Sequence, residues 1–509
     1  MKSDLATWLE TWAGCGPART ALHFEGTDIS YKALRDRVEF LSRRLAGAAA
    51  PGERIGYLGS NHPDVIALTF ACARSATILV PLNYRLAAPE IRTILEDCCP
   101  RLLLVAPEFA EMGDAIAAGT DTEVIHLRSS DGPWFTLSVP TVRASPAAAP
   151  SAQTLDRPLL LMYTSGTTGA PKGAVLTQEG MLWNARNAVD GHEMTASDNV
   201  LTNLPLFHVG GLAIQTLPAL YLGATVTLQS RFDPELALRE IAARRVTITL
   251  AVATMMRAML EHPAWKTTDL SSLRVVMTGA SIIPDSLLQA YLERGVIASQ
   301  VFGATEMGPI GACLRPSDAV RKLGSVGSPA VHRELRIVDS DGVALAPGLE
   351  GEIIVRGPGL MAGYWNNPAA TASALQEGWF HTGDMGRCDE EGFYYIVGRK
   401  KEMINSGGEK IYPAEIENVL SDCPDIVEAA VVGRPDPRWG EVPVAFVVAS
   451  PGCEISADEL RSRLNGSIAR YKLPRDYIFL DALPRNALGK IVRSELRDRA
   501  RRGAKLTSR

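Results

Sequence analysis

The strongest constraint on the fold is an alternation of helix-like and strand-like segments that recurs along the chain. Apolar residues are spaced as in a helix through Tyr31–Ala48, and a short apolar run follows at Arg54–Leu58. The same order recurs downstream, in segments 63–74 and 77–81, 236–244 and 247–252, and 287–294 and 297–302. Strands joined by helices of this length are typical of parallel sheets covered on both faces. We therefore expect an α/β fold.

The pattern changes after about residue 398. Before this point, 351–355 and 393–397 are expected to be strands. Beyond it, the apolar spacing predicts helices at 414–420, 457–468 and 492–501, and strands at 427–432, 444–448 and 477–480. A chain of 509 residues is too long for one compact core, and about 110 residues suit a small second domain. A stretch rich in Ala, Pro and Ser, 144–153, is expected to be a surface linker.

Charge and cysteine usage exclude several classes of protein. The 52 basic and 57 acidic side chains give a formal net charge of −5, which argues against nucleic acid as the main partner. The eight cysteines contain no C-x-x-C spacing, so we expect free or buried thiols in a reducing compartment. The first twelve residues carry Asp4 and Glu10 and do not resemble a signal peptide. The apolar window 65–82 is interrupted by Arg74 and is expected to be core rather than a transmembrane span. A cytoplasmic protein is expected.

The segment with the clearest chemistry is Tyr163-Thr-Ser-Gly-Thr-Thr-Gly-Ala-Pro-Lys172-Gly173, which follows an apolar strand. Glycines let backbone N–H groups converge on phosphate oxygens, hydroxyl groups add donors, and the lysine supplies positive charge. The alternative is a flexible surface loop, which would need no lysine at the end of so regular an array. It is not a Walker A motif, because Lys172 is followed by Gly173 rather than by Ser or Thr.

Further blocks follow in order: Leu204-Pro-Leu-Phe-His208, Gln300-Val-Phe-Gly-Ala-Thr305-Glu306, Gly363-Tyr-Trp, Trp379-Phe-His-Thr-Gly383-Asp384, Gly398-Arg399 through Gly407-Gly408, and Pro484-Arg-Asn-Ala-Leu-Gly489-Lys490. Together with the loop, they resemble the signature blocks of the adenylate-forming superfamily. This superfamily contains acyl-CoA synthetases, the amino-acid-activating domains of peptide synthetases, and firefly luciferase. The resemblance extends from about residue 31 to residue 493 and favours the acyl-CoA synthetase branch for fatty or aryl acids.

The resemblance implies a division into two domains. A large N-terminal domain, 1–398, would contain parallel and mixed sheets covered by helices, with a small β-barrel-like part. A small, mobile α+β lid, 402–509, would follow, with the hinge near Lys401.

The resemblance also implies the ATP site. ATP or AMP would contact Thr164, Ser165, Gly166, Thr167, Thr168, Gly169, Lys172, Gly279, Ala280, Val301, Phe302, Gly303, Thr305, Asp384, Arg399 and Lys490. Glu306 would bind Mg²⁺, whose preference for oxygen ligands suits a carboxylate. The catalytic residues would be Lys490, Thr305 and His208, with Lys490 bridging the substrate carboxylate and the α-phosphate. Such a transfer concentrates negative charge, so positioning and electrostatic stabilisation dominate the catalysis.

Two further sets are implied for the acyl group and for coenzyme A. The acyl pocket would contain His208, Val209, Gly210, Gly303 and Ala304. Coenzyme A would contact Ser406, Gly407, Gly408, Trp439 and Lys472, and ordinary packing of the lid is the alternative for the last two.

Two departures from the family pattern stand out. Phe302 occupies a position where tyrosine is common, which keeps the flat ring for adenine and loses the hydroxyl group. Asn405 and Lys410 stand where some members carry a lysine and a glutamine, and they are given no role.

Three functions compete at this point. The first is a carboxylate–CoA ligase that uses ATP, Mg²⁺ and CoA. The second is an adenylating enzyme that loads an acyl group onto a carrier protein or activates an amino acid; the amino-acid version is disfavoured because His208 stands where such members place an aspartate. The third is an inactive binding protein, which would be expected to have lost Lys490, Glu306 or Lys172.

The substrate remains open between a medium- or long-chain fatty acid and an aryl acid such as a benzoate or hydroxycinnamate, with cyclic or steroid-derived acids as a smaller alternative. Apolar residues near His208 favour an apolar acyl tail in either case. The oligomeric state is not readable from the sequence, and a homodimer is one option.

Overall fold

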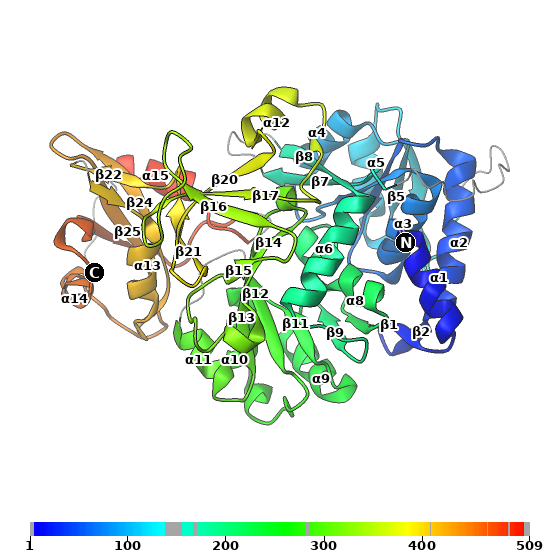
Figure 1. Cartoon of the computed structure of the whole chain (residues 1–509), viewed down its shortest axis with the longest axis horizontal. Coiled ribbons are helices and arrows are strands. Elements are labelled where there is room, and N and C mark those ends of the chain that lie inside the picture. Colours follow the sequence, from blue (N-terminus) through cyan, green and yellow to red (C-terminus); the bar gives the residue numbers. More distant parts are fainter. Residues whose placement is uncertain are drawn as a thin grey trace. The chain divides into compact units, whose positions relative to one another are not determined.

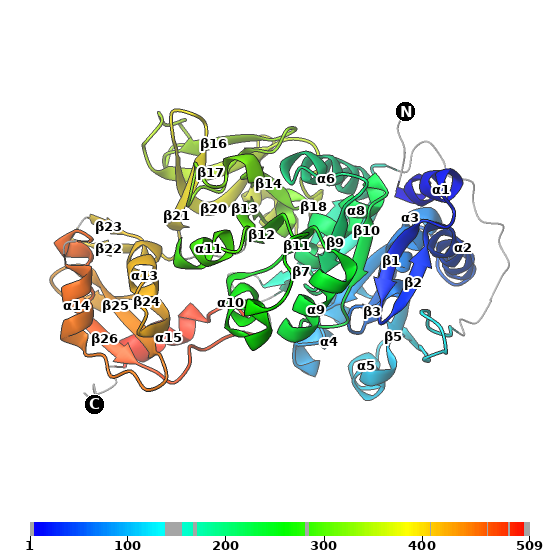
Figure 2. The ribbon, with the colours of Figure 1, turned by 90° about the horizontal axis from the view of Figure 1, so that it is seen from below.

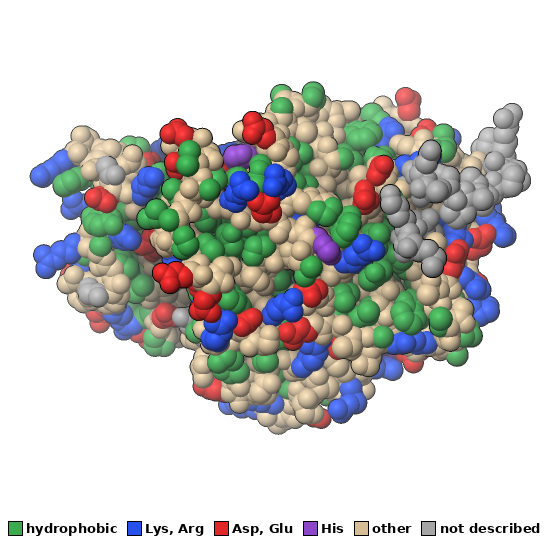
Figure 3. Space-filling view, viewed as in Figure 1, with side chains coloured by type: hydrophobic (Ala, Val, Ile, Leu, Met, Phe, Trp, Pro, Cys, Tyr) green, Lys and Arg blue, Asp and Glu red, His purple; other side chains and the backbone are tan. Residues whose placement is uncertain are grey.

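The structure is a computed structural model of the whole chain, and it describes residues 5–137, 155–165, 171–279, 285–407, 409–465, 467–486 and 489–502. These residues form two compact units. The first is drawn from 1–281, 290–335 and 355–380, and the second from 282–289, 336–354 and 381–509. On the face shown in Figure 3, basic and acidic side chains are interspersed, which fits the small net charge.

The larger sheet of the first unit has nine strands in the order β15-β14-β13-β12-β11-β9-β10-β1-β2. Its six central strands, β13 to β1 in that order, run parallel, while β14 and β2 run antiparallel to their neighbours. The bounds are β1 Thr20–Phe24, β2 Thr27–Ser30, β9 Asn199–Thr202, β10 Thr225–Leu228, β11 Ile248–Leu250, β12 Val275–Gly279, β13 Ile297–Gly303, β14 Ile310–Cys313 and β15 Ser328–Pro329.

The second sheet of this unit has seven strands in the order β18-β8-β7-β4-β3-β5-β6. Strands β7 to β6 in that order are parallel, and β8 pairs antiparallel with both β7 and β18. The bounds are β3 Arg54–Leu58, β4 Ile78–Leu82, β5 Leu102–Val105, β6 Glu123–His126, β7 Pro158–Ser165, β8 Pro171–Thr177 and β18 Gly363–Tyr364.

Helices pack around these two sheets, and α1, α2 and α3 lie side by side (Figures 1 and 2). Helix α2 begins where the Ser30 side chain accepts a hydrogen bond from the Ala33 N–H, and it buries one apolar stripe. These helices are α1 Leu5–Cys15, α2 Tyr31–Ala48, α3 Pro63–Ser75, α4 Ala88–Cys98, α5 Ala110–Ala117, α6 Gln178–Gly191, α7 Val209–Gly211, α8 Leu217–Leu222, α9 Pro234–Arg244, α10 Ala253–Glu261 and α12 Pro368–Ala374. Most of α11, Asp285–Leu292, belongs to the second unit.

A five-stranded sheet contains β16, β17, β20 and β19 in that order, with β21 also paired to β20. Strand β20 runs antiparallel to both β19 and β21. The bounds are β16 Glu334–Val338, β17 Gly351–Arg356, β19 Leu375–Gln376, β20 Trp379–Cys388 and β21 Tyr394–Arg399.

The C-terminal part of the second unit contains another five-stranded sheet, with the order β23-β22-β25-β24 and β26 paired to β25. Helices α13 and α15 pack on β24, and α14 packs on α13. The bounds are β22 Ile404–Ser406, β23 Glu409–Ile411, β24 Ile426–Asp436, β25 Gly440–Ala449, β26 Asp476–Phe479, α13 Pro413–Ser421, α14 Ala457–Leu464 and α15 Arg493–Arg501.

Most of the expected elements are confirmed. The helix at Tyr31–Ala48 and the strand at Arg54–Leu58 have the predicted bounds. The helix predicted over 457–468 ends earlier, at Leu464, because Asn465 adopts an extended conformation. Segment 144–153 lies outside the described residues, and a domain boundary between 398 and 402 stays a prediction.

The cysteines and the apolar window also follow expectation. All eight cysteines are free thiols, and Cys72, Cys98, Cys313 and Cys423 are buried. Residues 63–73 of α3 are all buried, in agreement with a core position. Over the described residues, no helix has the length and apolarity needed to cross a membrane.

Candidate active site

The ends of the glycine-rich segment are held together as a strand pair. Strands β7 and β8 place Thr164 opposite Lys172 and Tyr163 opposite Gly173. The predicted phosphate-binding residues Gly166, Thr167, Thr168 and Gly169 lie outside the described residues, as do Ala280 and Gly408, and only the backbone of Ser165 is described. The described part therefore brings together the first hydroxyl group and the lysine of the motif.

Glu306 lies beside this strand pair. Its Oε1 accepts hydrogen bonds from the Tyr364 hydroxyl group at 2.9 Å and from Thr164 Oγ1 at 3.4 Å. The ammonium group of Lys172 lies 5.3 Å from the centre of the Tyr364 ring, within cation–π range. Burial and the Glu306 carboxylate raise the pKa of Tyr364, so its phenol remains a hydrogen-bond donor. Three segments far apart in sequence thus meet at one carboxylate.

This carboxylate is suited to binding a magnesium ion. One oxygen, Oε1, is oriented by two neutral hydroxyl donors, and within the described residues no hydrogen bond or ion pair reaches Oε2. Mg²⁺ in nucleotide sites is commonly held by one or two carboxylates together with phosphate oxygens and water. Glu306 therefore fits the predicted metal ligand, and Lys172 adds positive charge nearby.

Four of the predicted ATP-binding residues lie at the carboxyl ends of two neighbouring parallel strands. Gly279 ends β12 and Val301 lies opposite it on β13, followed by Phe302 and Gly303. A Cβ at Gly279 would lie 2.5 Å from the Val301 carbonyl oxygen, so only glycine fits there. The same holds for Gly303, where a Cβ would lie 2.0 Å from the Pro309 carbonyl oxygen. Ligands bind at this edge of open parallel sheets.

Thr305 begins a short 3₁₀ turn, Thr305–Met307, directly after Ala304, and it is buried. The turn carries Thr305 and Glu306 in adjacent positions at the end of β13. The sequence predicted a site role for both residues, and the structure adds the two hydroxyl groups that contact Glu306.

The His208 block is shaped by a buried asparagine that sequence reasoning missed. The Asn61 amide donates to the carbonyl oxygens of Leu204 (2.9 Å) and Gln229 (3.0 Å), and its Oδ1 accepts from the Leu206 N–H at 2.7 Å. His208 Nδ1 accepts from the Gly210 N–H at 3.0 Å, which places the imidazole at the start of α7. One side chain from the bend between β3 and α3 thus holds the segment before His208.

Aromatic side chains surround the residue before His208. Phe207 meets the Tyr84 ring edge-on at a centroid distance of 5.3 Å, and Tyr84 contacts Phe109 at 5.0 Å. The guanidinium group of Arg85 lies over both Tyr84 and Phe207. Val209 and Gly210, predicted for the acyl pocket, are buried in α7.

In the second unit, Asp384 and Arg399 form an ion pair. They are cross-strand partners on β20 and β21, and Arg399 Nε lies 2.7 Å from Asp384 Oδ1. Burial raises the pKa of Asp384 to about 6 and outweighs the opposing effect of Arg399, whose side chain is half exposed. Two residues that the family resemblance assigns to ATP are therefore in direct contact.

Glu352 supports the turn before Asp384, and no sequence motif points to this residue. Its carboxylate accepts from the Gly383 N–H at 3.1 Å and from Lys400 Nζ at 2.9 Å. The Lys400 N–H in turn donates to the Gly383 carbonyl oxygen. Glu352 therefore ties the Gly383–Asp384 turn to the residues next to the predicted hinge at Lys401.

Lys490 is exposed and follows a turn closed by Asn486. The Asn486 Oδ1 accepts from the Lys490 N–H, and the Asn486 N–H donates to the Lys490 carbonyl oxygen, each at 2.9 Å. The charge of Lys490 also lowers the pKa of Asp384, which places these two predicted site residues near each other within the second unit.

The predicted CoA residues separate into two groups. Ser406 pairs with Gly440 on β25, the Gly407 N–H donates to the Trp439 carbonyl oxygen, and a Cβ at Gly407 would lie 2.7 Å from the Trp439 ring. Lys472 instead forms an ion pair with Glu415 of α13. Asn405 and Lys410, which received no role, are cross-strand partners on β22 and β23.

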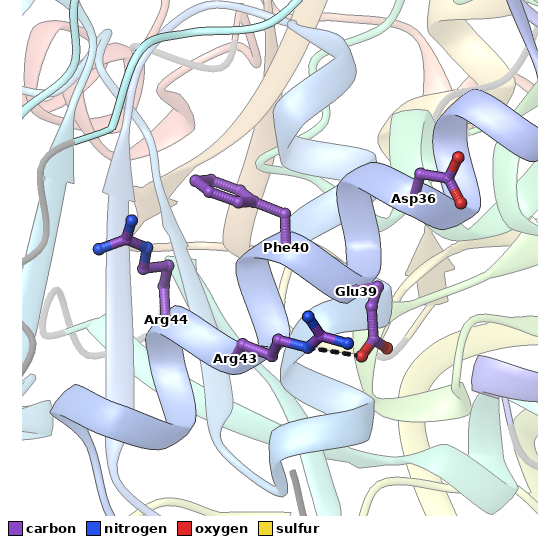
Figure 4. Close-up of a pocket in the computed structure, with 5 residues that line it drawn as sticks. All are labelled: Asp36, Glu39, Phe40, Arg43 and Arg44. Carbon is purple, nitrogen blue, oxygen red and sulfur yellow. Dashed lines mark hydrogen bonds and ion pairs between the residues drawn. The ribbon is translucent and has the colours of Figure 1, made fainter. Parts of the chain in front are cut away.

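Two surface hollows lie on the first unit, and Asn61 is among the residues that line the second of them. One, of about 390 Å³, runs along α2 and is lined by Asp36, Glu39, Phe40, Arg43 and Arg44, with Arg43 paired to Glu39 (Figure 4). The other, of about 550 Å³, contains the stacked rings of His62 and Phe135. Neither contains a predicted site residue, so the candidate site rests on the motif residues themselves.

Comparison with known proteins gives a consistent result. The profile of AMP-binding enzymes matches residues 9–365, and that of the AMP-binding enzyme C-terminal domain matches residues 415–490. Indoleacetate–CoA ligase of Aromatoleum aromaticum is 47% identical over 497 residues, covering 97% of this chain and 98% of the relative. Feruloyl-CoA synthase of an Amycolatopsis species is 41% identical over 496 residues, covering 97% and 99%.

A solved structure agrees with these relatives. O-succinylbenzoate coenzyme A synthetase of Bacillus subtilis, in complex with ATP and magnesium ion, superimposes with a TM-score of 0.84 at 33% identity, covering 96% of this chain and 98% of that chain. The chain therefore belongs to the AMP-binding enzyme family, within the branch that contains the acyl-CoA and aryl-CoA ligases.

Proposed function

We propose that this protein is a carboxylate–CoA ligase that converts a carboxylic acid, ATP and CoA into an acyl-CoA, AMP and pyrophosphate. A carboxylate oxygen attacks the α-phosphorus of ATP, and pyrophosphate leaves. The CoA thiolate then attacks the acyl carbon, and AMP leaves. The observation that carries the proposal is the convergence of the Thr164 and Tyr364 hydroxyl groups on Glu306, with the Lys172 ammonium group over the Tyr364 ring. It brings hydroxyl donors and a cation to a carboxylate that can bind a metal ion.

Several of the predicted residues have roles in the first step. Lys172 and Thr164 hold the departing phosphates, while Thr305 binds the α-phosphate. Magnesium bound by Glu306 would neutralise phosphate charge, which is the chemistry that this ion supplies in phosphoryl transfer. Lys490 bridges the attacking carboxylate and the α-phosphate, and Asp384 with Arg399 binds the ribose.

In the second step the thiol of CoA must reach the acyl carbon, next to which Lys490 lies during the first step. We assign the hinge about which the lid moves between the two steps to Lys401, which lies between an N-terminal domain of 1–398 and a lid of 402–509. Ser406, Gly407, Gly408 and Trp439 are assigned to CoA, supported by the close packing of Gly407 on the exposed Trp439 ring. Lys472 is a weaker candidate, because its ammonium group is already paired with Glu415.

An aryl acid is the favoured substrate. The two relatives compared in sequence are named for indoleacetate and for a feruloyl group, both of which carry an aromatic ring. Phe207, Tyr84 and Phe109 form an aromatic cluster directly beside His208, and such rings favour a planar acyl group. A fatty acid is the second candidate, since the residues around His208 are apolar.

The cellular compartment and the oligomeric state are two further proposals. Eight free thiols fit the reducing cytoplasm. A homodimer is proposed as the assembly to test by light scattering, which would give about twice the 54.8 kDa of one chain.

The function is tested with purified protein, MgATP and CoA across arylacetates, hydroxycinnamates, benzoates and fatty acids of increasing length. AMP, pyrophosphate and thioester are measured separately. We expect CoA-dependent thioester and equal AMP for an arylacetate or a hydroxycinnamate, and loss of both in Lys490→Ala. Pyrophosphate release without thioester would instead indicate carrier loading, and turnover of fatty acids alone would reject the aryl substrate.

A further inference from the structure

We propose that Asp97 is a positioning residue for the phosphates of ATP, acting through Tyr163 on the strand pair that carries Thr164 and Lys172. The inference rests on the proposed ATP site. It assigns to the end of helix α4, outside every motif, the task of fixing where the first hydroxyl group and the lysine of the phosphate-binding segment lie.

The first contact joins α4 to the entry of this segment. The Tyr163 hydroxyl group donates a hydrogen bond to Asp97 Oδ2 at 2.5 Å. A hydrogen bond to a carboxylate is about twice as strong as one between neutral groups. Burial raises the pKa of Tyr163, so the phenol keeps the proton that it donates. Since Tyr163 directly precedes Thr164, this bond sets the orientation of the strand end.

The second contact joins the exit of the segment to the same place. The Trp365 N–H donates to the Gly173 carbonyl oxygen at 2.7 Å, and its indole N–H donates to the Asp97 carbonyl oxygen at 3.3 Å. Gly173 is the cross-strand partner of Tyr163, and a Cβ there would lie only 3.0 Å from Tyr163 Cζ. Tyr163, Gly173, Trp365 and Asp97 therefore form a closed ring of contacts near the loop end of the strand pair.

The end of α4 is itself held firmly. Arg54 donates to the carbonyl oxygens of Cys98 at 2.7 Å and Cys99 at 2.9 Å. Its guanidinium group also lies 5.3 Å from the centre of the Trp365 ring. A cation over these carbonyl groups at the helix C-terminus is favourable. Asp97 thus contacts Tyr163 from a helix end whose carbonyl groups are bound by Arg54.

This ring matters because phosphate transfer depends on position. Groups displaced by about 1 Å can lose about a hundredfold in rate. The loop end of this strand pair extends beyond Leu160 of β7, which pairs with β4, and beyond Ala174 of β8, which pairs with β18. The ring supports this end from outside the pair, and it touches none of the residues assigned to the acyl group or to CoA. Its loss should therefore weaken ATP binding selectively.

The test compares Asp97→Ala, Asp97→Asn and Tyr163→Phe with a matched control, Glu96→Ala. Glu96 is exposed on the same helix and pairs with Arg92. We expect Asp97→Ala and Tyr163→Phe to raise the KM for ATP about five- to thirtyfold, less than the full effect of one lost charged hydrogen bond because Asp97 acts on ATP through Tyr163. The KM values for the acid and for CoA should change less than about twofold. Asp97→Asn, which keeps an acceptor oxygen, should recover most of the loss, and the control should match the wild type.

A double variant sharpens the result. Because both changes remove the same bond, Asp97→Ala with Tyr163→Phe should be little worse than either alone. Additive effects, or a fall in melting temperature with all three KM values shifted alike, would overturn the proposal in favour of general destabilisation. An unchanged KM for ATP in Tyr163→Phe would overturn it as well.

Direct binding separates this inference from the function. Calorimetric titration of ATP needs no turnover, so it applies even if no acid is activated. Tighter binding to wild type than to Asp97→Ala, without turnover, would support the ring and reject the ligase. Equal binding by both proteins, with active wild type, would reject the ring alone.

Discussion

At the scale of single residues, burial and ion pairing shift the pKa of Asp384 in opposite directions. Burial dominates and raises its pKa to about 6, while Arg399 and Lys490 lower it and Glu402 and Glu352 raise it further. A carboxyl group with a raised folded-state pKa contributes stability at low pH and loses it as the pH rises through about 6. Ribose binding has the opposite dependence, because the ionised form is the better hydrogen-bond acceptor.

The first prediction follows from this opposition. Between pH 7 and pH 5 the ionised fraction of Asp384 falls about tenfold, so the KM for ATP should rise by about five- to tenfold. The Asp384→Asn variant should have a higher KM at pH 7 and almost no dependence on pH. Initial rates at saturating acid and CoA give the measurement. A wild-type KM that is flat across this range would contradict the assignment.

Tyr364 gives a second prediction at this scale. Tyr364→Phe removes the hydrogen bond to Glu306 Oε1 and keeps the ring under Lys172. We expect a several-fold higher Mg²⁺ concentration for half-maximal activity, and a similar loss in the Mg²⁺ dependence of ATP binding measured by calorimetry. Tyr395→Phe, in which the hydroxyl group lies near Asp389, is the matched control. Equal Mg²⁺ dependence in both variants would show that Tyr364 does not orient the carboxylate.

The sequence predicted residues such as Glu306 and Asp384, because each stands inside a recognisable block. It did not predict their supports. Tyr364 lies within a block, but its hydroxyl contact with Glu306 depends on β18 reaching β8. Glu352 and Asp97 lie outside every block, and only the tertiary fold brings them to Asp384 and Tyr163. Supporting side chains of this kind are set by strand order, which local patterns do not encode.

At the scale of elements, the segment before His208 depends on Asn61, a side chain from the bend between β3 and α3. Asn61 satisfies two carbonyl oxygens and one N–H at the ends of β9 and β10. A buried backbone group left without its partner costs about 1–3 kcal/mol. The segment should therefore shift when the amide is removed.

The third prediction concerns this segment. Asn61→Ala should raise the KM for the carboxylic acid about tenfold or more and leave the KM for ATP within about twofold. Asn203→Ala is a suitable control, because this amide is also buried near the end of β9 and makes no hydrogen bond within the described residues. If Asn61→Ala changes both KM values equally, Asn61 supports the whole unit rather than the His208 segment.

Of all features of the structure, the positions of helices and strands were the most predictable from the sequence. Regular apolar spacing placed α2 and β3 with the bounds that the fold shows, because their buried faces repeat with the helical or strand period. Ends set by local conformation were less predictable, as in α14, where extended Asn465 stops the helix. Strand order was not predictable, since β9 and β10 are separated from β1 by more than 170 residues yet pair in one sheet.

At the scale of the whole molecule, two buried histidines make stability depend on pH. Burial lowers the pKa of His62 and of His192 to about 3, with Arg37 and Arg274 adding to the effect. Unfolded chains bind protons at these histidines below about pH 6.5, whereas the folded protein does not until about pH 3. Stability is therefore fully present above about 6.5 and is lost progressively as the pH falls toward 3.

The fourth prediction uses His192, whose ring nitrogens have no hydrogen-bond partner in the described part of the chain. Between pH 7.5 and pH 5.5, each such histidine should remove about 1.4 kcal/mol of stability. His192→Gln should lower the melting temperature at pH 7.5 but reduce the further decrease at pH 5.5. His126→Gln, at an exposed position, is the control. An unchanged pH dependence in His192→Gln would exclude His192 as its source.

The central claim is that the acid is activated as an acyl-adenylate, and oxygen labelling tests it most directly. A carboxylic acid with ¹⁸O at both carboxyl oxygens is incubated with the enzyme, MgATP and CoA. The ¹⁸O content of each product is then measured by mass spectrometry. Attack on the α-phosphorus leaves one labelled oxygen in AMP, so AMP should gain one ¹⁸O for each thioester formed, with none in pyrophosphate. Label in inorganic phosphate, or thioester formed without labelled AMP, would contradict the account.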